Sequence, residues 1–326
     1  MSKVIIAWWS GGVTSAVACK IALDTLDEVK VVMLDTMNED EDTYRFLKDC
    51  ENWYGVKIDV FKHPDYESIE DVWRKYKSLS SATGAVCSNT LKNYTREIYC
   101  KGKNVEGHVF GFEYHKKEMN RAKNWERNHN LKAFFPLIDR EITKLDAMQI
   151  LKDQGIELPR VYGYGFNNNN CFKTGCTQGG IGYWQKIKDD FPEKFDKMAE
   201  MEHELSRLKG EPVVICHDQR KIYDIEKYKK QCEWNELCPD DQYFDYTNII
   251  QHGRLITKWD ISKRSGKPNK KSKLFLKHNS EYPEIRTIDV IKGKHTAIIE
   301  EFECNGFCGL EDNGNKLDFM ELIHDK

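Results

Sequence analysis

The sequence predicts an α/β protein with a doubly wound, mostly parallel sheet and a smaller C-terminal unit. Short apolar runs alternate with helical patterns over about the first 160 residues, as expected for strands joined by helices that cover both faces of a sheet. Beyond Gly210 the patterns become shorter and more polar. The length of 326 residues suits one large domain and an appended one, at roughly 100–200 residues per domain.

Four apolar runs in the first half are the expected strands: Val4–Trp9, Val29–Leu34, Lys57–Phe61 and His108–Gly111. Helical patterns lie between them at Asp40–Tyr54, Ser68–Tyr76 and Asn89–Cys100. Parallel strands with right-handed crossovers bind ligands at the carboxyl edge of the sheet. Asp35 follows the second run and Gly111 ends the fourth. We therefore expect both residues at the edge that also holds the loop after the first run.

The alternation breaks near residue 160, where glycines and the four asparagines Asn167–Asn170 favour turns. The patterns that follow indicate two helices and two strands, at Ile181–Lys188, Glu193–Lys209, Val213–Cys216 and Thr287–Ile291. We therefore predict three parts: a nucleotide-binding domain over residues 1–160, a cysteine-containing turn with helices over 161–210, and a smaller unit over 211–326.

Composition, charge and cysteine content indicate what kind of protein this is and in which compartment we expect it. The net charge of −3 says little about partners, and the 40% hydrophobic residues suffice for a packed core. The N-terminus lacks the pattern of a cleaved leader, and no stretch approaches the ~18 apolar residues of a membrane span. We expect a soluble cytoplasmic protein without a membrane partner. In that compartment the eleven cysteines favour metal or redox chemistry over a disulfide framework.

The first apolar run leads directly into Ser10–Ser15, S-G-G-V-T-S, and then into an alanine-rich helical pattern. Two glycines let the backbone approach an anion, and three hydroxyls can donate beside the unpaired N–H groups of a new helix. This arrangement predicts a phosphate site. The loop has neither the G-x-x-x-x-G-K-[ST] nor the G-x-G-x-x-G spacing of two other nucleotide loops. An ordinary glycine turn is the alternative interpretation.

The S-G-G-x-T-S string resembles the pyrophosphatase loop of the adenine nucleotide α-hydrolase-like superfamily, whose members cleave ATP between the α and β phosphates. Further patches resemble, in order, the phosphoadenosine phosphosulfate reductase branch of that superfamily. They are the strand end Leu34–Thr36, the C-x-x-x-x-K string Cys87–Lys92, the P-L-I-D element within Phe135–Asp139, and the pair Cys171 and Cys176. The resemblance spans about residues 4 to 205.

Three departures limit what the resemblance implies. The arginine usual after the fourth strand is Glu113, and the Glu118-x-x-Arg121 pair differs by one residue from the family's E-x-x-x-R spacing. The reductases' C-terminal E-C-G-L-H string is not reproduced, because an acid, Glu311, follows Leu310 where the histidine would be. The last departure disfavours a plain reductase.

The resemblance implies that the glycine loop holds the β and γ phosphates of ATP, with Mg²⁺ bridging phosphate oxygens. The implied nucleotide-binding residues are Ser10, Gly11, Gly12, Thr14, Ser15, Asp35 and Gly111. Asp35 would face the ribose or adenine, and Lys92 and Arg121 would act as catalytic residues. Cationic side chains suit α–β cleavage, because the reaction depends on positioning and on stabilising negative charge. A helix cap and a solvated ion pair are the alternative roles for Asp35 and Arg121.

The cysteines fall where family members carrying an iron–sulfur cluster have ligands. The resemblance implies a [4Fe–4S] cluster held by Cys87, Cys171, Cys176 and a fourth thiolate from elsewhere, for which we take Cys308, with Cys304 as the alternative. Thiolates are the ligands that such clusters and zinc require. The four-residue gap between Cys171 and Cys176 is wider than the common two-residue gap. Zinc, and thiols that are reactive or merely buried, are therefore alternatives.

Residues 252–280 carry nine lysines and arginines against the single acid Asp260, with Trp259 and Phe275 interleaved. The basic residues are Arg254, Lys258, Lys263, Arg264, Lys267, Lys270, Lys271, Lys273 and Lys277. Such a stretch is typical of a loop that follows the phosphate backbone of a nucleic acid. A solvated surface loop is the alternative.

Together these features predict an ATP pyrophosphatase that adenylates an acceptor oxygen for sulfur transfer. It is similar to the ATP-pyrophosphatase component of DNA phosphorothioation systems, which implies a cysteine desulfurase as sulfur donor. Three alternatives stay open: a tRNA- or nucleobase-modifying enzyme, a reductase of an adenylylated sulfate, and a module that senses a nucleotide without cleaving it. A reductase would need a nucleophilic cysteine, for which Cys308 is the best candidate.

Overall fold

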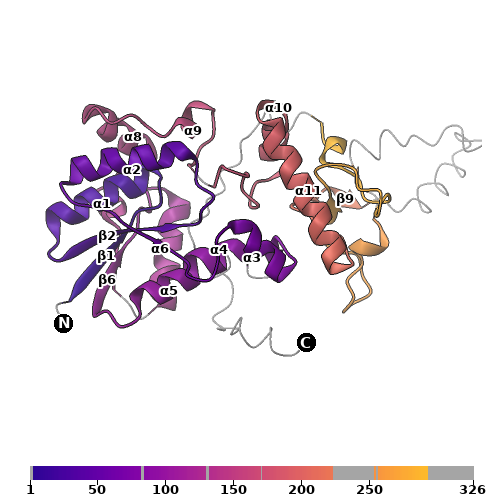
Figure 1. The fold of residues 1–326 in the computed structure, drawn as a ribbon, viewed down its shortest axis with the longest axis horizontal. Coiled ribbons are helices and arrows are strands. Elements are labelled where there is room, and N and C mark those ends of the chain that lie inside the picture. The colour runs from indigo at the N-terminus through magenta and orange to yellow at the C-terminus, as the bar shows by residue number, and fades with distance from the viewer. Residues whose placement is uncertain are drawn as a thin grey trace, which may run out of the picture. The chain divides into compact units, whose positions relative to one another are not determined.

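The computed structural model describes residues 3–81, 84–129, 132–169, 171–222, 253–254 and 256–292. These residues divide into two compact units (Figure 1). The first unit extends to Cys176, and the second begins at Thr177 and also takes in Lys77–Leu79. The predicted boundaries at residues 160 and 210 stay a prediction.

The first unit is built on a parallel five-stranded sheet in the order β3-β2-β1-β6-β7. Its strands are β1 (Val4–Trp8), β2 (Val29–Asp35), β3 (Asp59–Lys62), β6 (Val105–Val109) and β7 (Lys132–Phe134). This confirms the predicted α/β class with a parallel sheet. The chain runs outward from β1 to β3 and then returns to β6 on the other side of β1. The order therefore reverses between β1 and β6, and such a switch point is where doubly wound sheets bind ligands.

Alternating side chains of β1 supply the two faces of the sheet, as the two-residue period of a strand requires. Ala7 packs in the core with helices α1 (Val13–Thr25), α2 (Glu41–Tyr54) and α8 (Lys144–Asp153), which lie on one side of the sheet (Figure 1). Ile6, on the opposite face, packs with Tyr99 of α5 (Thr95–Cys100). Helices therefore cover both faces.

The other helices of the first unit lie in the connections. They are α3 (Ile69–Tyr76), α4 (Val86–Ser88), the π-helix η1 (Asn89–Tyr94), α6 (Lys116–Asn128), α7 (Pro136–Asp139) and α9 (Arg160–Gly163). A short antiparallel pair, β4 (Ser80–Ser81) and β5 (Gly84–Ala85), precedes α4. The helical predictions for residues 40–54, 68–76 and 89–100 are confirmed. The sequence patterns missed α6, which buries few apolar side chains, and β7, which is only three residues long.

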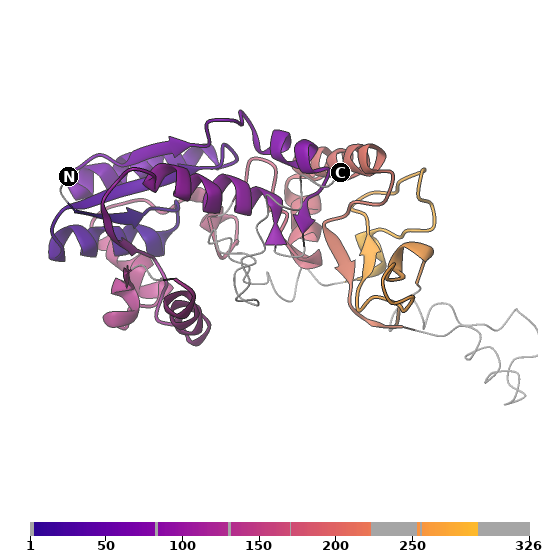
Figure 2. The same ribbon diagram turned by 90° about the horizontal axis from the view of Figure 1, so that it is seen from below.

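The second unit contains α10 (Ile181–Asp190), α11 (Pro192–Lys209) and short strands (Figure 2). β8 (Cys216–Asp218) pairs antiparallel with β11 (Ser272–Leu274), and β9 (Lys221–Ile222) pairs parallel with β10 (Gly253–Arg254). Two 3-10 helices, η3 (Lys258–Asp260) and η4 (Ile288–Val290), complete the described elements. None of the helices in the described part of the chain is long and apolar enough to cross a membrane.

Two strand predictions in the second unit need correction. The predicted strand at Thr287–Ile291 is wrong, because Ile291 N donates to Ile288 O and the segment closes into η4. The strand predicted to begin at Val213 begins at Cys216. Val213 N donates instead to Ser206 Oγ of α11, so side chains of that helix take the backbone donors that a sheet partner would otherwise take.

Candidate nucleotide site

The S-G-G-V-T-S string, Ser10–Ser15, which we call the glycine loop, leads from β1 into the first turn of α1 at the switch point of the sheet. Gly11 has a φ of +83°, a left-handed conformation that favours glycine. A Cβ on Gly11 would lie 2.8 Å from Thr43 Cγ2, so the loop also passes too close to α2 for a larger residue. The local sequence therefore needs glycine here for two reasons, and the turn delivers the chain into the first turn of α1.

Ser15 stabilises the loop from within. Its buried hydroxyl donates to Gly12 O at 2.8 Å and accepts from Ser10 N at 3.0 Å and from Ser10 Oγ at 3.1 Å. The Thr14 hydroxyl has no hydrogen-bond partner within the described ranges. The hydroxyls of Ser10 and Thr14 are thus more available to a ligand than that of Ser15, which holds the loop in its conformation.

Gly111 brings the connection after β6 against the first turn of α1. A Cβ at this position would lie 2.5 Å from Ser15 Cα and 2.7 Å from Ser15 N, closer than side-chain carbons approach backbone. Glycine is therefore required by the close approach of two backbone segments. The geometry places Gly111 beside the glycine loop, at the edge where the sequence predicted it.

A distant segment closes over the loop. We call residues 157–174 the clasp. The Tyr162 hydroxyl of the clasp accepts from Val13 N at 3.3 Å and so occupies the first N–H of α1. Asn169 Nδ2 donates to Gly11 O at 2.9 Å and to Thr43 Oγ1 at 3.0 Å, while Asn169 Oδ1 is buried and has no partner among the residues that the structure describes. The clasp therefore fixes both the loop and the start of α1.

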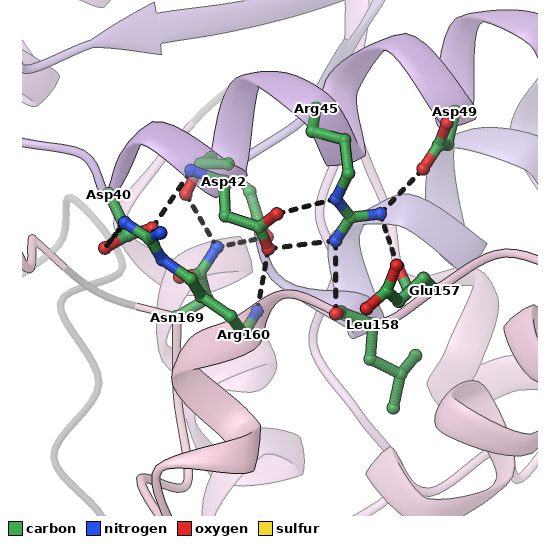
Figure 3. Close-up of polar contacts among 10 residues, drawn as sticks. Asp40, Asp42, Arg45, Asp49, Glu157, Leu158, Arg160 and Asn169 are labelled. Atoms are coloured by element: carbon green, nitrogen blue, oxygen red, sulfur yellow. Dashed lines mark hydrogen bonds and ion pairs between the residues drawn. The ribbon is translucent and has the colours of Figure 1, made fainter.

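Charged side chains hold the clasp to the N-terminus of α2 (Figure 3). Asp40 caps this helix by accepting from Asp42 N, and Arg160 Nε donates to Asp40 Oδ1 at 2.6 Å. Arg45 donates to both oxygens of Asp42 and also to the carbonyl of Glu157. The Arg45 guanidinium holds the pKa of the Asp42 carboxyl below its ordinary value. The network ties the two segments together across 118 positions of sequence.

Backbone hydrogen bonds extend the clasp along the end of β2. Asn38 O accepts from Phe172 N at 3.0 Å and from Lys173 N at 3.1 Å, and Asn38 Oδ1 accepts from Thr174 N at 3.1 Å. Cys171 Sγ lies 3.5 Å from Thr36 Oγ1. The cysteine segment thus reaches the carboxyl edge of the sheet.

Asp35 ends β2 with its carboxylate almost fully buried, at 1% exposure. It accepts from Met37 N at 2.7 Å and from the Tyr44 hydroxyl at 3.0 Å, and it lies 3.4 Å from Lys62 Nζ. Burial and the neighbouring Asp35 carboxylate raise the pKa of Tyr44. Asp35 therefore acts within the protein as a local cap, and its contact with a ribose or adenine stays a prediction.

The two predicted catalytic cations lie on helices of the first unit. Lys92 is half-buried in the π-helix η1, a widened turn of a kind found often at functional sites. Arg121 Nη1 lies 2.6 Å from Glu118 Oε2, and its guanidinium lies 4.6 Å from the centre of the Phe112 ring. This pairing confines Arg121 to one position. The catalytic roles of both residues stay predictions.

The predicted metal ligands Cys87, Cys171 and Cys176 are all buried. Within the described ranges, no group of three histidine, cysteine, aspartate or glutamate side chains is placed to hold a metal ion. The fourth predicted ligand, Cys308, lies outside the described residues. The described residues therefore form no metal site by themselves, and the predicted cluster or zinc site, which includes Cys308, stays a prediction.

The sequence pattern does not indicate the clasp residues that contact the loop. Asn169 belongs to the asparagine run, which predicted only a turn, and Tyr162 lies in a short glycine-containing segment. Their partners Val13 and Gly11 are 149 and 158 positions away, so no local pattern records these contacts. The composition offers one signal, because four successive asparagines supply more amide donors than a turn requires.

Comparison with known proteins gives one family match. The model of the phosphoadenosine phosphosulfate reductase domain family matches residues 4–178, more than half of the chain. The chain is 27% identical over 207 residues to the uncharacterized protein MJ0066 of Methanocaldococcus jannaschii, covering 60% of this chain and 41% of that protein. It is 22% identical over 194 residues to MJ0973 of the same organism, covering 59% and 46%. The chain thus spans less than half the length of these relatives.

Among solved structures, the chain is similar to a phosphoadenylyl-sulfate reductase from Candida auris in complex with phosphate. The similarity has a TM-score of 0.41 at 14% sequence identity, and it covers 52% of this chain and 81% of that one.

Proposed function

The chain belongs to the phosphoadenosine phosphosulfate reductase domain family, and from that premise we propose that it binds ATP in the glycine loop and cleaves it between the α and β phosphates. One observation carries the proposal: the first turn of α1 emerges from the glycine loop at the switch point of the sheet, with Gly11 required by its positive φ and the nearby Thr43 side chain, and Gly111 by a close approach of two backbone segments. The unpaired N–H groups and the dipole at such a helix start favour phosphate.

The phosphate oxygens would bind in place of the Tyr162 hydroxyl. This hydroxyl now takes the N–H of Val13. When a phosphate oxygen accepts from Val13 N, Tyr162 is left beside it as a donor. The hydroxyls of Ser10 and Thr14 would turn to the same phosphates, while Ser15 keeps the loop in shape.

The proposed reaction joins the α-phosphorus to an acceptor oxygen. The acceptor attacks the α-phosphorus, the bond from that phosphorus to the bridging oxygen breaks, and pyrophosphate leaves. Lys92 and Arg121 would offset the charge on the departing oxygens. Mg²⁺ bound to ATP would be held mainly by phosphate oxygens, with few protein ligands.

Sulfur transfer is the finer part of the proposal. A nucleophilic sulfur would displace AMP from the adenylated acceptor, so that sulfur replaces the oxygen. The sequence resemblance suggested a cysteine desulfurase as the donor and DNA phosphorothioation as one form of the reaction. Both extend beyond family membership and stay predictions.

A reductase is the second candidate, favoured by the family match itself. Purified protein is incubated with Mg²⁺ and ATP, and separately with an adenylylated sulfate and a thiol, and the products are resolved. AMP with pyrophosphate supports the proposal, and sulfite supports the reductase. Intact nucleotide in both incubations, or cleavage of ATP to ADP and phosphate, contradicts the proposal. A Gly11→Val variant, purified in the same way, should lose the activity, which excludes a contaminating enzyme.

A further inference from the structure

A basic hairpin projects from the second unit. It comprises residues 261–271, in which Ile261 and Pro268 form an antiparallel bridge. Ser262 N donates to Lys267 O at 2.9 Å, and Gly266, with a φ of +63°, donates its N–H to Ser262 O at 2.8 Å. The hairpin is thus a turn over residues 262–267 that a single antiparallel bridge closes.

Some basic residues of the region 252–280 stabilise the base of this hairpin. Arg254 is buried and donates to Asn269 O at 2.7 Å and to Ser272 Oγ at 2.9 Å. Lys273 Nζ donates to Pro212 O at 3.0 Å, and burial lowers its pKa. Both cations have internal structural roles and are not positioned to contact a ligand.

Three further lysines are paired with carboxylates. Lys263 Nζ lies 3.0 Å from Glu211, Lys277 Nζ lies 2.6 Å from Asp196, and Lys258 Nζ lies 4.0 Å from Glu284. These exposed ion pairs contribute little to the free energy of folding. Each carboxylate nevertheless offsets the charge of its lysine, so little net positive charge remains at these positions.

Four basic side chains have no such partner. Arg264, Lys267, Lys270 and Lys271 are exposed, and no carboxylate of the described residues lies within ion-pair distance of them. All four belong to the hairpin. The unpaired positive charge of the region is therefore concentrated on this hairpin, in a chain whose net charge is −3.

We propose that the basic hairpin binds the phosphate backbone of duplex DNA. Lysine, arginine, serine and asparagine side chains are typical phosphate contacts. Residues 262–271 contain no aromatic or large apolar side chain. They therefore lack both the apolar anchor of a membrane-surface segment and the stacking platform of a single-strand binder. A narrow hairpin turn fits the wide major groove of B-DNA, where its cations can reach the phosphates on either side, whereas the major groove of duplex RNA is too narrow for side chains to enter.

The inference goes beyond the proposed function, and its test uses the full chain without nucleotide, so either can fail alone. Anisotropy of a labelled 20-base-pair DNA is measured over a range of salt concentrations. The variant Lys270→Ala/Lys271→Ala should lower the slope of log affinity against log salt by about 0.9 per lost contact, or about 1.8. Arg264→Ala/Lys267→Ala should act similarly. The matched control Lys258→Ala/Lys277→Ala removes the same charge from the paired lysines and should leave the slope nearly unchanged.

Three outcomes would overturn the proposal. One is the absence of binding by the unmodified chain at about 50 mM salt, where phosphate contacts are strong. Another is an equal loss of slope in the control and hairpin variants, which would indicate a diffuse charge effect. The third is tighter binding to duplex RNA, to single-stranded DNA or to vesicles of anionic lipid than to duplex DNA.

Discussion

The glycine loop and the basic hairpin are both suited to anions, but they differ in how their polar groups are arranged. In the loop, Ser15, Tyr162 and Asn169 hold the backbone in place through internal hydrogen bonds. In the hairpin, four charged side chains point into solvent without ion-pair partners among the described residues. Backbone N–H groups bind a phosphate only when their geometry is fixed, whereas exposed cations need only proximity. Substitutions should therefore act steeply in the loop and in small, salt-dependent steps in the hairpin.

The largest effect should follow Gly111→Ala. Its Cβ would lie 2.5 Å from Ser15 Cα, a backbone atom in the first turn of α1 that cannot move aside as a flexible side chain would. We expect a loss of about 3 kcal/mol or more in the free energy of unfolding, as for a severe case of overpacking, and no measurable ATP binding. The control is Gly163→Ala in α9, where an added Cβ meets nothing within 4 Å. Equal stability of the two variants in urea unfolding would contradict the close approach.

Acid should weaken the first unit through the buried side chain of His108. Burial lowers the pKa of His108 to about 4 from an ordinary 6.5, and Trp8 Nε1 donates to its Nδ1 at 3.1 Å. The unfolded chain binds a proton below pH 6.5, whereas the folded chain does so only below about pH 4. Stability should therefore fall by about 3 kcal/mol as the pH drops through this window.

Denaturant unfolding of the unmodified chain and of His108→Gln over that pH range tests the assignment. In His108→Gln the free energy of unfolding should lose most of its dependence on pH. In the control His115→Gln, which changes an exposed histidine, that dependence should remain. An unchanged slope in His108→Gln would show that another group is responsible.

Removing the clasp amide should have an intermediate effect. Asn169→Ala takes a donor from Gly11 O and from Thr43 Oγ1, which are both in the interior. We expect about 2 kcal/mol of destabilisation and a weaker ATP complex. Asn167→Ala, in the same run but exposed, is the control. If calorimetry gave both variants the affinity of the unmodified chain, the clasp would have no part in the site.

The smallest effect should come from Tyr162→Phe. The variant loses one neutral hydroxyl, worth about 1 kcal/mol, so ATP affinity should fall about three- to tenfold with little change in folding. Tyr164→Phe, two positions along the same segment, should bind ATP normally. Tighter binding by Tyr162→Phe would mean that the hydroxyl only competes with phosphate.

The sequence was sufficient to predict the elements with strong local patterns. The strands β1 and β2 and the loop after Trp9 could be predicted because their hydrophobic period and glycines lie within short windows. The sequence could not predict the clasp, because Arg160 and Asp40 are 120 positions apart and come together only in the folded chain. Thr287–Ile291 was mistaken for a strand because a short apolar run fits either structure.

The central claim is that phosphates bind at the start of α1, and calorimetric titration of ATP with Mg²⁺ tests it most directly. Ser10→Ala/Thr14→Ala removes two hydroxyl donors from the loop but leaves Ser15 to shape it. Hydrogen bonds to charged groups contribute about 1.5–3 kcal/mol each, so affinity should fall at least tenfold. The control is Thr25→Ala, whose hydroxyl donates to Ile21 O at the far end of the same helix. Unchanged ATP affinity in the double variant, with folding intact by circular dichroism, would contradict the claim.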